Sequence, residues 1–179
     1  IDLPLNLELA NTAEMVAFAC DLKPDFACLV PEKREEVTTE GGLDVVDNQR
    51  SLRKTIATLQ SLGIQVSLFI DSEEDQIKAA ADIGAEMIEL HTGAFALTTG
   101  EKHESEIERL RAGADLGSSL GLQVNAGHGI HLENVKDLFS VKNLKEFNIG
   151  HTLISRGLFI GIRAAVNEMK VAMQGYPQS

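Results

Sequence analysis

Six short runs of apolar residues recur along the chain, and each leads to a polar residue able to bind a ligand or take part in catalysis. The runs span 5–8, 26–32, 66–71, 87–91, 122–128 and 147–151, and their polar ends are Glu8, Glu32, Asp71, His91, His128 and His151. Each run precedes a segment with helical periodicity, so the layout repeats strand, loop and helix. Polar residues at the carboxyl ends of parallel strands build the active sites of α/β proteins. The pattern therefore predicts an α/β fold with its site where the strands end.

The same patterning predicts the individual elements. Strands are expected at 3–9, 26–30, 64–70, 87–90, 122–125 and 147–149, and helices at 12–22, 47–62, 75–83, 101–120, 132–139 and 152–173. The segments 31–46 and 93–100 are expected to be irregular. The first is polar, exceeds an ordinary βα loop and contains Gly41-Gly42, which makes it a candidate lid.

Chain length limits how many such units are present. A complete eight-unit barrel takes about 250 residues, roughly 30 per unit, so 179 residues accommodate six units. The last two runs end in Gly-rich turns, and the loops after strands seven and eight are the usual phosphate site of a barrel. We therefore expect a single domain over 1–179, a partial (β/α)8 barrel with strands three to eight. Because the chain opens on Ile1 and an apolar run, we expect that an amino-terminal part is absent.

Composition narrows the function classes. The formal net charge of −11 argues against nucleic acid and anionic membrane surfaces as partners. No apolar stretch reaches the roughly 18 residues that a membrane span requires, and no signal-peptide pattern is visible. Cys20 and Cys28 lie in a helical and a strand pattern, so both are expected to be buried thiols in a reducing cytoplasm.

Two carboxylates are the first candidates for chemistry. Side chains alternate along a strand, so Asn6 and Glu8 share one face, as do Glu89 and His91. Two carboxylates in one partly dry cavity repel each other, and at least one pKa should rise toward the range of a general base. A structural ion pair is the alternative role for each.

Histidines between glycines are the second candidates. His128 lies between Gly127 and Gly129, whose flexible backbone leaves N–H groups accessible to an anion, and it can transfer a proton near neutrality. His151 follows Gly150 at the start of a predicted helix, a place suited to phosphate. The role of His91 stays open between support of the site and the core, while His103 and His131 are expected at the surface.

A metal site is the less favoured interpretation. Glu8, Glu89, His91, His128 and His151 are ligand types found in metal-dependent sugar isomerases, but no short metal-binding motif accompanies them. No metal or other cofactor is therefore expected.

Five motifs stand out along the chain. They are the stretch Leu29-Val30-Pro31-Glu32-Lys33-Arg34-Glu35-Glu36-Val37-Thr38-Thr39-Glu40-Gly41-Gly42-Leu43-Asp44, and the shorter Asn6-Leu7-Glu8, Ile88-Glu89-Leu90-His91-Thr92-Gly93, Val124-Asn125-Ala126-Gly127-His128-Gly129 and Asn148-Ile149-Gly150-His151. Together they resemble the pyridoxine 5′-phosphate synthase family. The resemblance implies a (β/α)8 barrel enzyme. Its reaction condenses 1-deoxy-D-xylulose 5-phosphate with 3-amino-2-oxopropyl phosphate to give pyridoxine 5′-phosphate, phosphate and water.

The resemblance also implies residue roles. Glu8 would be a proton acceptor, Glu89 would stabilise charged transition states, and His128 would be a proton donor. Thr38 would contact deoxyxylulose phosphate, and Gly129, Gly150 and His151 would hold the aminoketone phosphate. It further implies a homo-oligomer.

The chain departs from the family pattern at its amino-terminal end. The two βα units expected there, with a further catalytic histidine and arginines for phosphate, have no counterpart in these 179 residues. Two alternatives therefore stay open: a non-catalytic phosphosugar-binding module and a metal-dependent sugar isomerase.

Overall fold

The computed structural model describes residues 2–32 and 41–177, in which strands and helices alternate. The strands are β1 (Asn6–Ala10), β2 (Phe26–Val30), β3 (Gln65–Ile70), β4 (Met87–His91), β5 (Gln123–Gly127) and β6 (Leu144–Asn148). The helices are α1 (Ala13–Leu22), α2 (Val45–Gln60), α3 (Glu74–Asp82), α4 (Gly93–Leu97), α5 (Glu101–Ser119), α6 (His151–Ile160) and α7 (Ile162–Ala172), with a 3₁₀ turn at Asp137–Ser140.

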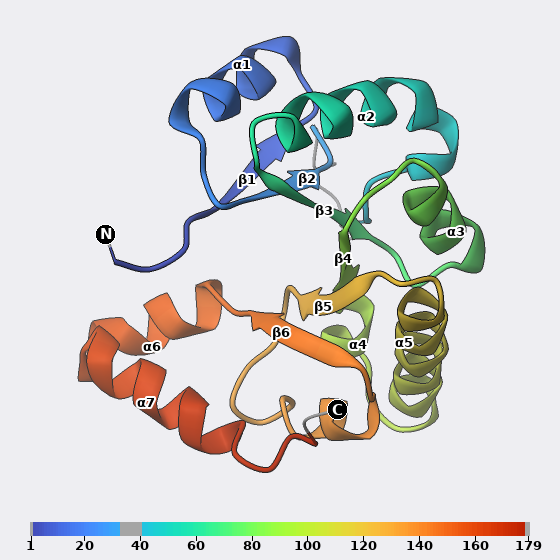
Figure 1. Ribbon diagram of the computed structural model, residues 1–179. Helices are drawn as coiled ribbons and strands as arrows, with labels where there is room; N and C mark the ends of the chain where they lie inside the picture. The colour runs from blue at the N-terminus through green and yellow to red at the C-terminus, as the bar shows by residue number, and fades with distance from the viewer. Residues whose placement is uncertain (1, 33–40, 178–179) are drawn as a thin grey trace.

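The six strands form one parallel sheet in sequence order, from β1 to β6. Parallel pairing of consecutive strands requires a crossover between each pair. Helices supply the first four crossovers, and turns with the 3₁₀ segment Asp137–Ser140 supply the one between β5 and β6. Figure 1 shows the sheet as a curved fan with β1 and β6 at its two ends. The α/β fold expected from the apolar runs is thus confirmed.

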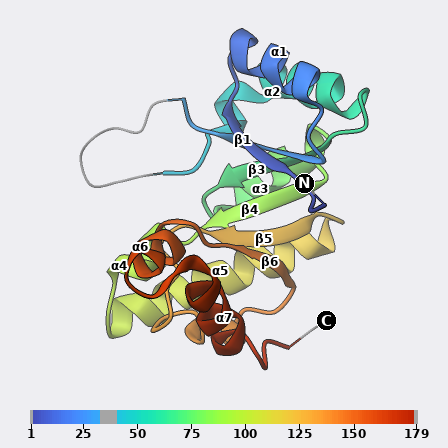
Figure 2. The same cartoon turned by 90° about the vertical axis from the view of Figure 1, so that its left-hand side faces the viewer.

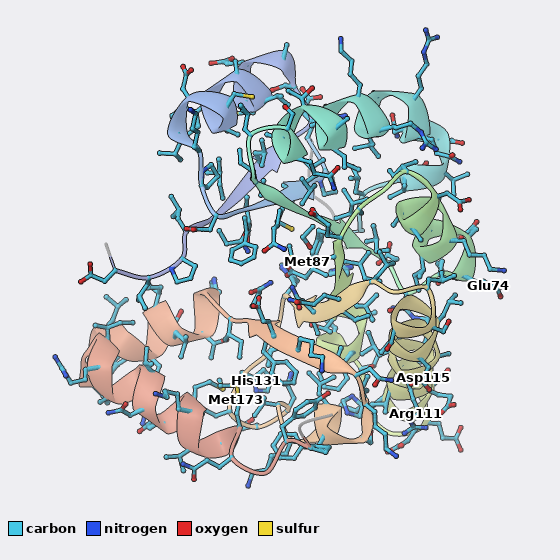
Figure 3. All side chains as sticks on the ribbon, viewed as in Figure 1. Glu74, Met87, Arg111, Asp115, His131 and Met173 are labelled. Atoms are coloured by element: carbon cyan, nitrogen blue, oxygen red, sulfur yellow. The ribbon has the colours of Figure 1, made fainter. Side chains whose placement is uncertain are left out.

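Helices α1, α2, α3 and α5 pack against the outer face of this sheet. The apolar positions of α2 show why, because Leu52, Ile56 and Leu59 recur at helical spacing and are all buried. Figure 3 shows the outcome: Glu74 of α3 and Arg111 of α5 lie at the periphery. The core therefore lies between the outer helices and the strands.

Several predicted boundaries were wrong. The first strand begins at Asn6 rather than Leu3, whose side chain is 75% exposed. The segment 93–100 contains the short helix α4, and 132–139 consists mainly of turns.

The last helix is also not continuous. Gly161 breaks the predicted 152–173 helix into α6 and α7, because its φ of +84° and ψ of 142° lie outside the helical region. Figure 2 shows α6 and α7 as two separate rods. No residue of α6 is buried, so this helix contributes little to the core.

Among the described residues, no helix is both long and apolar enough to cross a bilayer.

Candidate active site

A cavity of about 770 Å³ lies at the carboxyl ends of the strands, and all six strands or the residues directly after them contribute to it. Its lining consists of Asn6, Glu8, Val30, Phe69, Glu89, His128, Gly129, Ile130, Asn148, Ile149, Gly150, His151 and Thr152. This set contains six of the seven site residues predicted from the sequence. The seventh, Thr38, lies outside the described residues, as does half of the predicted lid, residues 33–40.

Glu89 is the most buried of the ionisable groups in the lining, with 4% of its surface exposed. Its Oε2 atom accepts a 2.6 Å hydrogen bond from Asn148 Nδ2 and lies 3.7 Å from Cys28 Sγ. Burial raises the pKa of Glu89 to about 7; the Asn148 hydrogen bond opposes the rise and the charge of Glu8 adds to it. Glu89 can therefore exchange a proton near neutral pH.

Glu8 differs from Glu89 because it stands on the edge strand β1. Its side chain is exposed and lines the cavity beside Asn6 on the same face of the strand. The expectation that one of two neighbouring carboxylates has a raised pKa is confirmed for Glu89, with burial as the larger cause and Glu8 as a smaller one. The two environments allow two roles, one for a buried and one for a solvated carboxylate.

The glycines around His128 are required by the structure. A Cβ atom on Gly127 would lie 1.9 Å from Glu89 Oε1, so only glycine leaves room for that carboxylate. Gly129 has a φ of +76°, and His128 itself has a φ of +79°, which is uncommon outside glycine. The hydroxyl of Thr92 lies 2.5 Å from the carbonyl oxygen of His128 and 2.7 Å from that of Gly127. The backbone of this turn is thereby anchored to the end of β4.

The second Gly-His turn begins helix α6. Gly150 precedes the helix and His151 is its first residue, so the first N–H groups of α6 have no partner within the helix. Thr152 Oγ1 donates a 3.0 Å hydrogen bond to the Ile130 carbonyl, which ties this turn to the loop after β5. Gly129, Gly150 and His151 all line the cavity, and the N–H groups at the start of α6 favour an anion.

His91 lies behind the cavity wall rather than in its lining. Its ring is buried, with Nδ1 3.0 Å from Asp71 Oδ1, and it packs against the rings of Phe69 and His128. This contact network favours support of the site over a plain core role, the two possibilities that the sequence left open.

Two residues that contact Glu89 were not predicted from the sequence as part of the site. Asn148 and Cys28, which contact Glu89, come from strands 59 and 61 residues away, so only strand register brings them together. Asp71 could be noticed in the sequence, because it is the polar residue that ends the apolar run 66–71. Cys28 is a buried free thiol as expected, whereas Cys20 is free but only partly buried.

The surface assignment of His103 was wrong. Its Nδ1 lies 3.1 Å from the Phe95 carbonyl and its Nε2 3.2 Å from Asp137, and its ring packs on that of Phe95. Within residues 2–32 and 41–177, no cluster of three or more His, Cys, Asp or Glu side chains has the arrangement of a metal site.

Comparison with known proteins shows the family of the chain. Residues 1–175 match the family model described as "Pyridoxal phosphate biosynthesis protein PdxJ". A pyridoxine 5′-phosphate synthase of Akkermansia muciniphila is 56% identical over 174 residues, which are 97% of this chain and 71% of the relative. One of Crocosphaera subtropica is 52% identical over 172 residues, 96% of this chain and 72% of the relative.

A solved structure supports the fold alone. The crystal structure of 3-keto-L-gulonate-6-phosphate decarboxylase from Vibrio cholerae has a TM-score of 0.61 at 14% identity, over 93% of this chain and 72% of that one. The family model and the identity to curated synthases show the family as well as the fold. The chain therefore belongs to the PdxJ family of pyridoxine 5′-phosphate synthases.

Proposed function

We propose that this chain carries the active site of a pyridoxine 5′-phosphate synthase. It would condense 1-deoxy-D-xylulose 5-phosphate with 3-amino-2-oxopropyl phosphate and release phosphate and water. The observation that carries the proposal is the shared cavity, in which Glu8, Glu89 and His128 stand within one lining. Ring formation from two carbonyl compounds needs several proton transfers, and these three groups supply an exposed carboxylate, a buried carboxyl and an imidazole.

The proposed roles follow from the environments. Glu8, exposed on β1, accepts a proton from a bound intermediate. Glu89, whose pKa burial raises to about 7, stabilises positive charge when ionised. His128, at the end of β5, donates a proton to a leaving oxygen.

Phosphate recognition is proposed for the two Gly-His turns of the lining. Gly129 and Gly150 present backbone without a Cβ, and His151 opens α6, whose first N–H groups have no partner within the helix. Their positions suit the phosphate of 3-amino-2-oxopropyl phosphate. Thr38 is proposed to contact deoxyxylulose phosphate from the segment 31–46, where it lies outside the described residues.

Three further features belong to the same proposal. Residues 1–179 form one domain that corresponds to strands three to eight of a barrel, supported by the single continuous sheet. A cytoplasmic location is part of the proposal, and the two free thiols support it. It forms a homo-oligomer, supported by the exposed apolar residues of α6.

The decisive experiment is direct. The purified chain is mixed with both phosphorylated substrates, and pyridoxine 5′-phosphate and inorganic phosphate are measured together. Equal amounts of the two products, lost in His128→Gln, would support the proposal. Binding of both substrates without product would instead favour the phosphosugar-binding module. Activity that disappears on dialysis against a chelator and returns with a divalent metal would favour an isomerase-like metal enzyme.

A further inference from the structure

Three buried side-chain polar atoms have no hydrogen-bond partner among the described residues: Ser67 Oγ, Ser72 Oγ and His91 Nε2. His91, which is 5% exposed, is the one that lies behind the cavity wall. A buried polar group without a partner is costly, and such a group calls for a functional explanation. The other ring nitrogen, Nδ1, lies 3.0 Å from Asp71 Oδ1.

The Asp71 contact decides where the His91 proton resides. Burial would raise the pKa of Asp71, but hydrogen bonds from His91 and from the Gly42 N–H lower it, so its carboxylate is ionised. An ionised carboxylate only accepts, so Nδ1 carries the hydrogen. A neutral His91 then holds its lone pair on Nε2, and a bare lone pair is less costly to bury than an N–H without an acceptor.

The position of Nε2 links the pair to His128. A Cβ atom on Gly93 would lie 2.4 Å from His91 Nε2 and 3.3 Å from His128 Cδ2, so both ring edges border the same small space. The centroids of the two imidazoles lie 5.3 Å apart at an interplanar angle of 61°. Phe69 packs against both rings, at 5.1 Å and 6.4 Å. The His128 ring thus rests on a wall formed by His91 and Phe69.

We propose that Asp71 and His91 form a positioning pair, in which Asp71 holds His91 as its Nδ1–H tautomer and the His91 ring fixes the imidazole of His128 at the cavity. The inference rests on the proposed role of His128 as proton donor, and it assigns functions to two residues outside the cavity lining. His91 touches no substrate in this scheme and acts only through His128.

Asp71→Asn is the sharpest variant because the two Asp71 oxygens have different partners. Oδ2 accepts from the Gly42 N–H at 3.0 Å, and an asparagine would have to keep its single oxygen there. Its NH₂ group would then face His91 Nδ1 and act as a donor. His91 must respond by moving its hydrogen to Nε2, into the space that it shares with His128. The fold should survive, since the Asp71 side chain is 37% exposed.

The chain offers a matched control. His103 and Asp137 form a second histidine–carboxylate contact, 3.2 Å long, whose histidine is stacked on Phe95. Neither residue lines the cavity. Asp137→Asn therefore makes the same chemical change at a comparable pair that the proposal does not involve.

The experiment combines nitrogen-15 NMR of the five histidines with steady-state kinetics, using His91→Gln and His128→Gln to assign the signals. In the wild type, His91 should show the Nδ1–H tautomer. In Asp71→Asn it should shift to Nε2–H, the His128 ring signals should move, and kcat should fall roughly 10- to 100-fold with KM changed less than about twofold. Asp137→Asn should leave the His91 and His128 signals and kcat at wild-type values.

The NMR signals test this inference, and the kinetics test the proposed function, so the two can fail independently. An Nε2–H tautomer in the wild type, or unmoved His128 signals in Asp71→Asn, would overturn the positioning pair whatever the activity. A second variant, His91→Phe, keeps a ring but removes both nitrogens, and it too should move the His128 signals. If the signals behave as expected in a chain that makes no pyridoxine 5′-phosphate, the pair stands as a structural unit and the proposed function fails.

Discussion

At the scale of single residues, Glu89 shows how a fold changes the chemistry of a common side chain. Its neighbours come from three strands: Cys28 from β2, Gly127 from β5 and Asn148 from β6. Burial disfavours the charged form of Glu89, and Asn148 returns part of that cost through its hydrogen bond. The result is a carboxyl whose pKa of about 7 places its proton exchange at physiological pH.

This raised pKa predicts how stability depends on pH. The folded state holds the Glu89 proton up to about pH 7, whereas the unfolded state loses it near pH 4.5. Between these values the folded state binds more protons, so the free energy of unfolding falls as pH rises. In Glu89→Gln this loss should vanish, which makes the variant more stable than wild type at pH 8 by at most about 3 kcal/mol. Denaturant unfolding at pH 4.5 and pH 8 measures the difference, with the exposed Glu133→Gln as control. A pH-independent difference between Glu89→Gln and wild type would contradict the prediction.

Glu8 is predicted to act in the reaction rather than in the fold. Glu8→Gln keeps the shape of the side chain and removes its ability to accept a proton. Product formation should therefore slow by roughly 10²- to 10⁴-fold while both substrates still bind. Turnover and calorimetric binding are measured on the same preparation. The control is Glu14→Gln, which changes an exposed glutamate on α1. Turnover close to wild type in Glu8→Gln would remove Glu8 from the mechanism.

At the scale of elements, the buried strand β2 was easier to predict than the break in the last helix. β2 has the boundaries that its apolar run indicated, because a strand inside a parallel sheet is apolar on both faces. The helix break at Gly161 was missed because apolar residues on both sides continue a helical pattern, while the backbone turns there. The contact between Asp71 and His91 depends on β3 and β4 lying side by side, which sequence spacing alone does not reveal.

Adding a side chain should have different effects on stability at the two Gly-rich turns. At Gly129 a Cβ would lie 2.6 Å from the Cβ of Ala96, and its φ of +76° is strained for other residues. Gly129→Ala should therefore cost about 1–3 kcal/mol of stability. At Gly150 a Cβ would meet no atom within 4 Å, and other residues readily adopt its φ of −112°, so a side chain there should cost little stability.

Gly150→Val isolates the phosphate role for that reason. The variant should unfold within about 0.5 kcal/mol of wild type. Its branched side chain should nevertheless block the phosphate of 3-amino-2-oxopropyl phosphate, with a much smaller effect on deoxyxylulose phosphate. Calorimetric titration of each ligand into both proteins makes the comparison. Unchanged affinity for the aminoketone phosphate would place its phosphate elsewhere.

At the scale of the whole molecule, the described sheet has two unpaired edges and an apolar region beside one of them. β1 and β6 each pair with one neighbour only. Close to β6, α6 and the start of α7 expose Ile154, Leu158, Phe159 and Ile162, the middle two by 82% and 86%. Large apolar side chains exposed together on one segment are typical of an interaction site. The net charge of −11 works against it, because like-charged copies repel one another.

These opposing effects predict association that depends on salt. Screening weakens the repulsion between copies and leaves apolar contact nearly unchanged. Sedimentation velocity of the 179-residue chain should therefore show larger species at 0.5 M than at 0.05 M sodium chloride. The double variant Leu158→Lys with Phe159→Lys should stay monomeric at both concentrations. Leu97→Lys, a change of an equally exposed leucine on α4, should associate as the wild type does. If the double variant still associated, contact between copies would have to use another surface, such as the edges at β1 and β6.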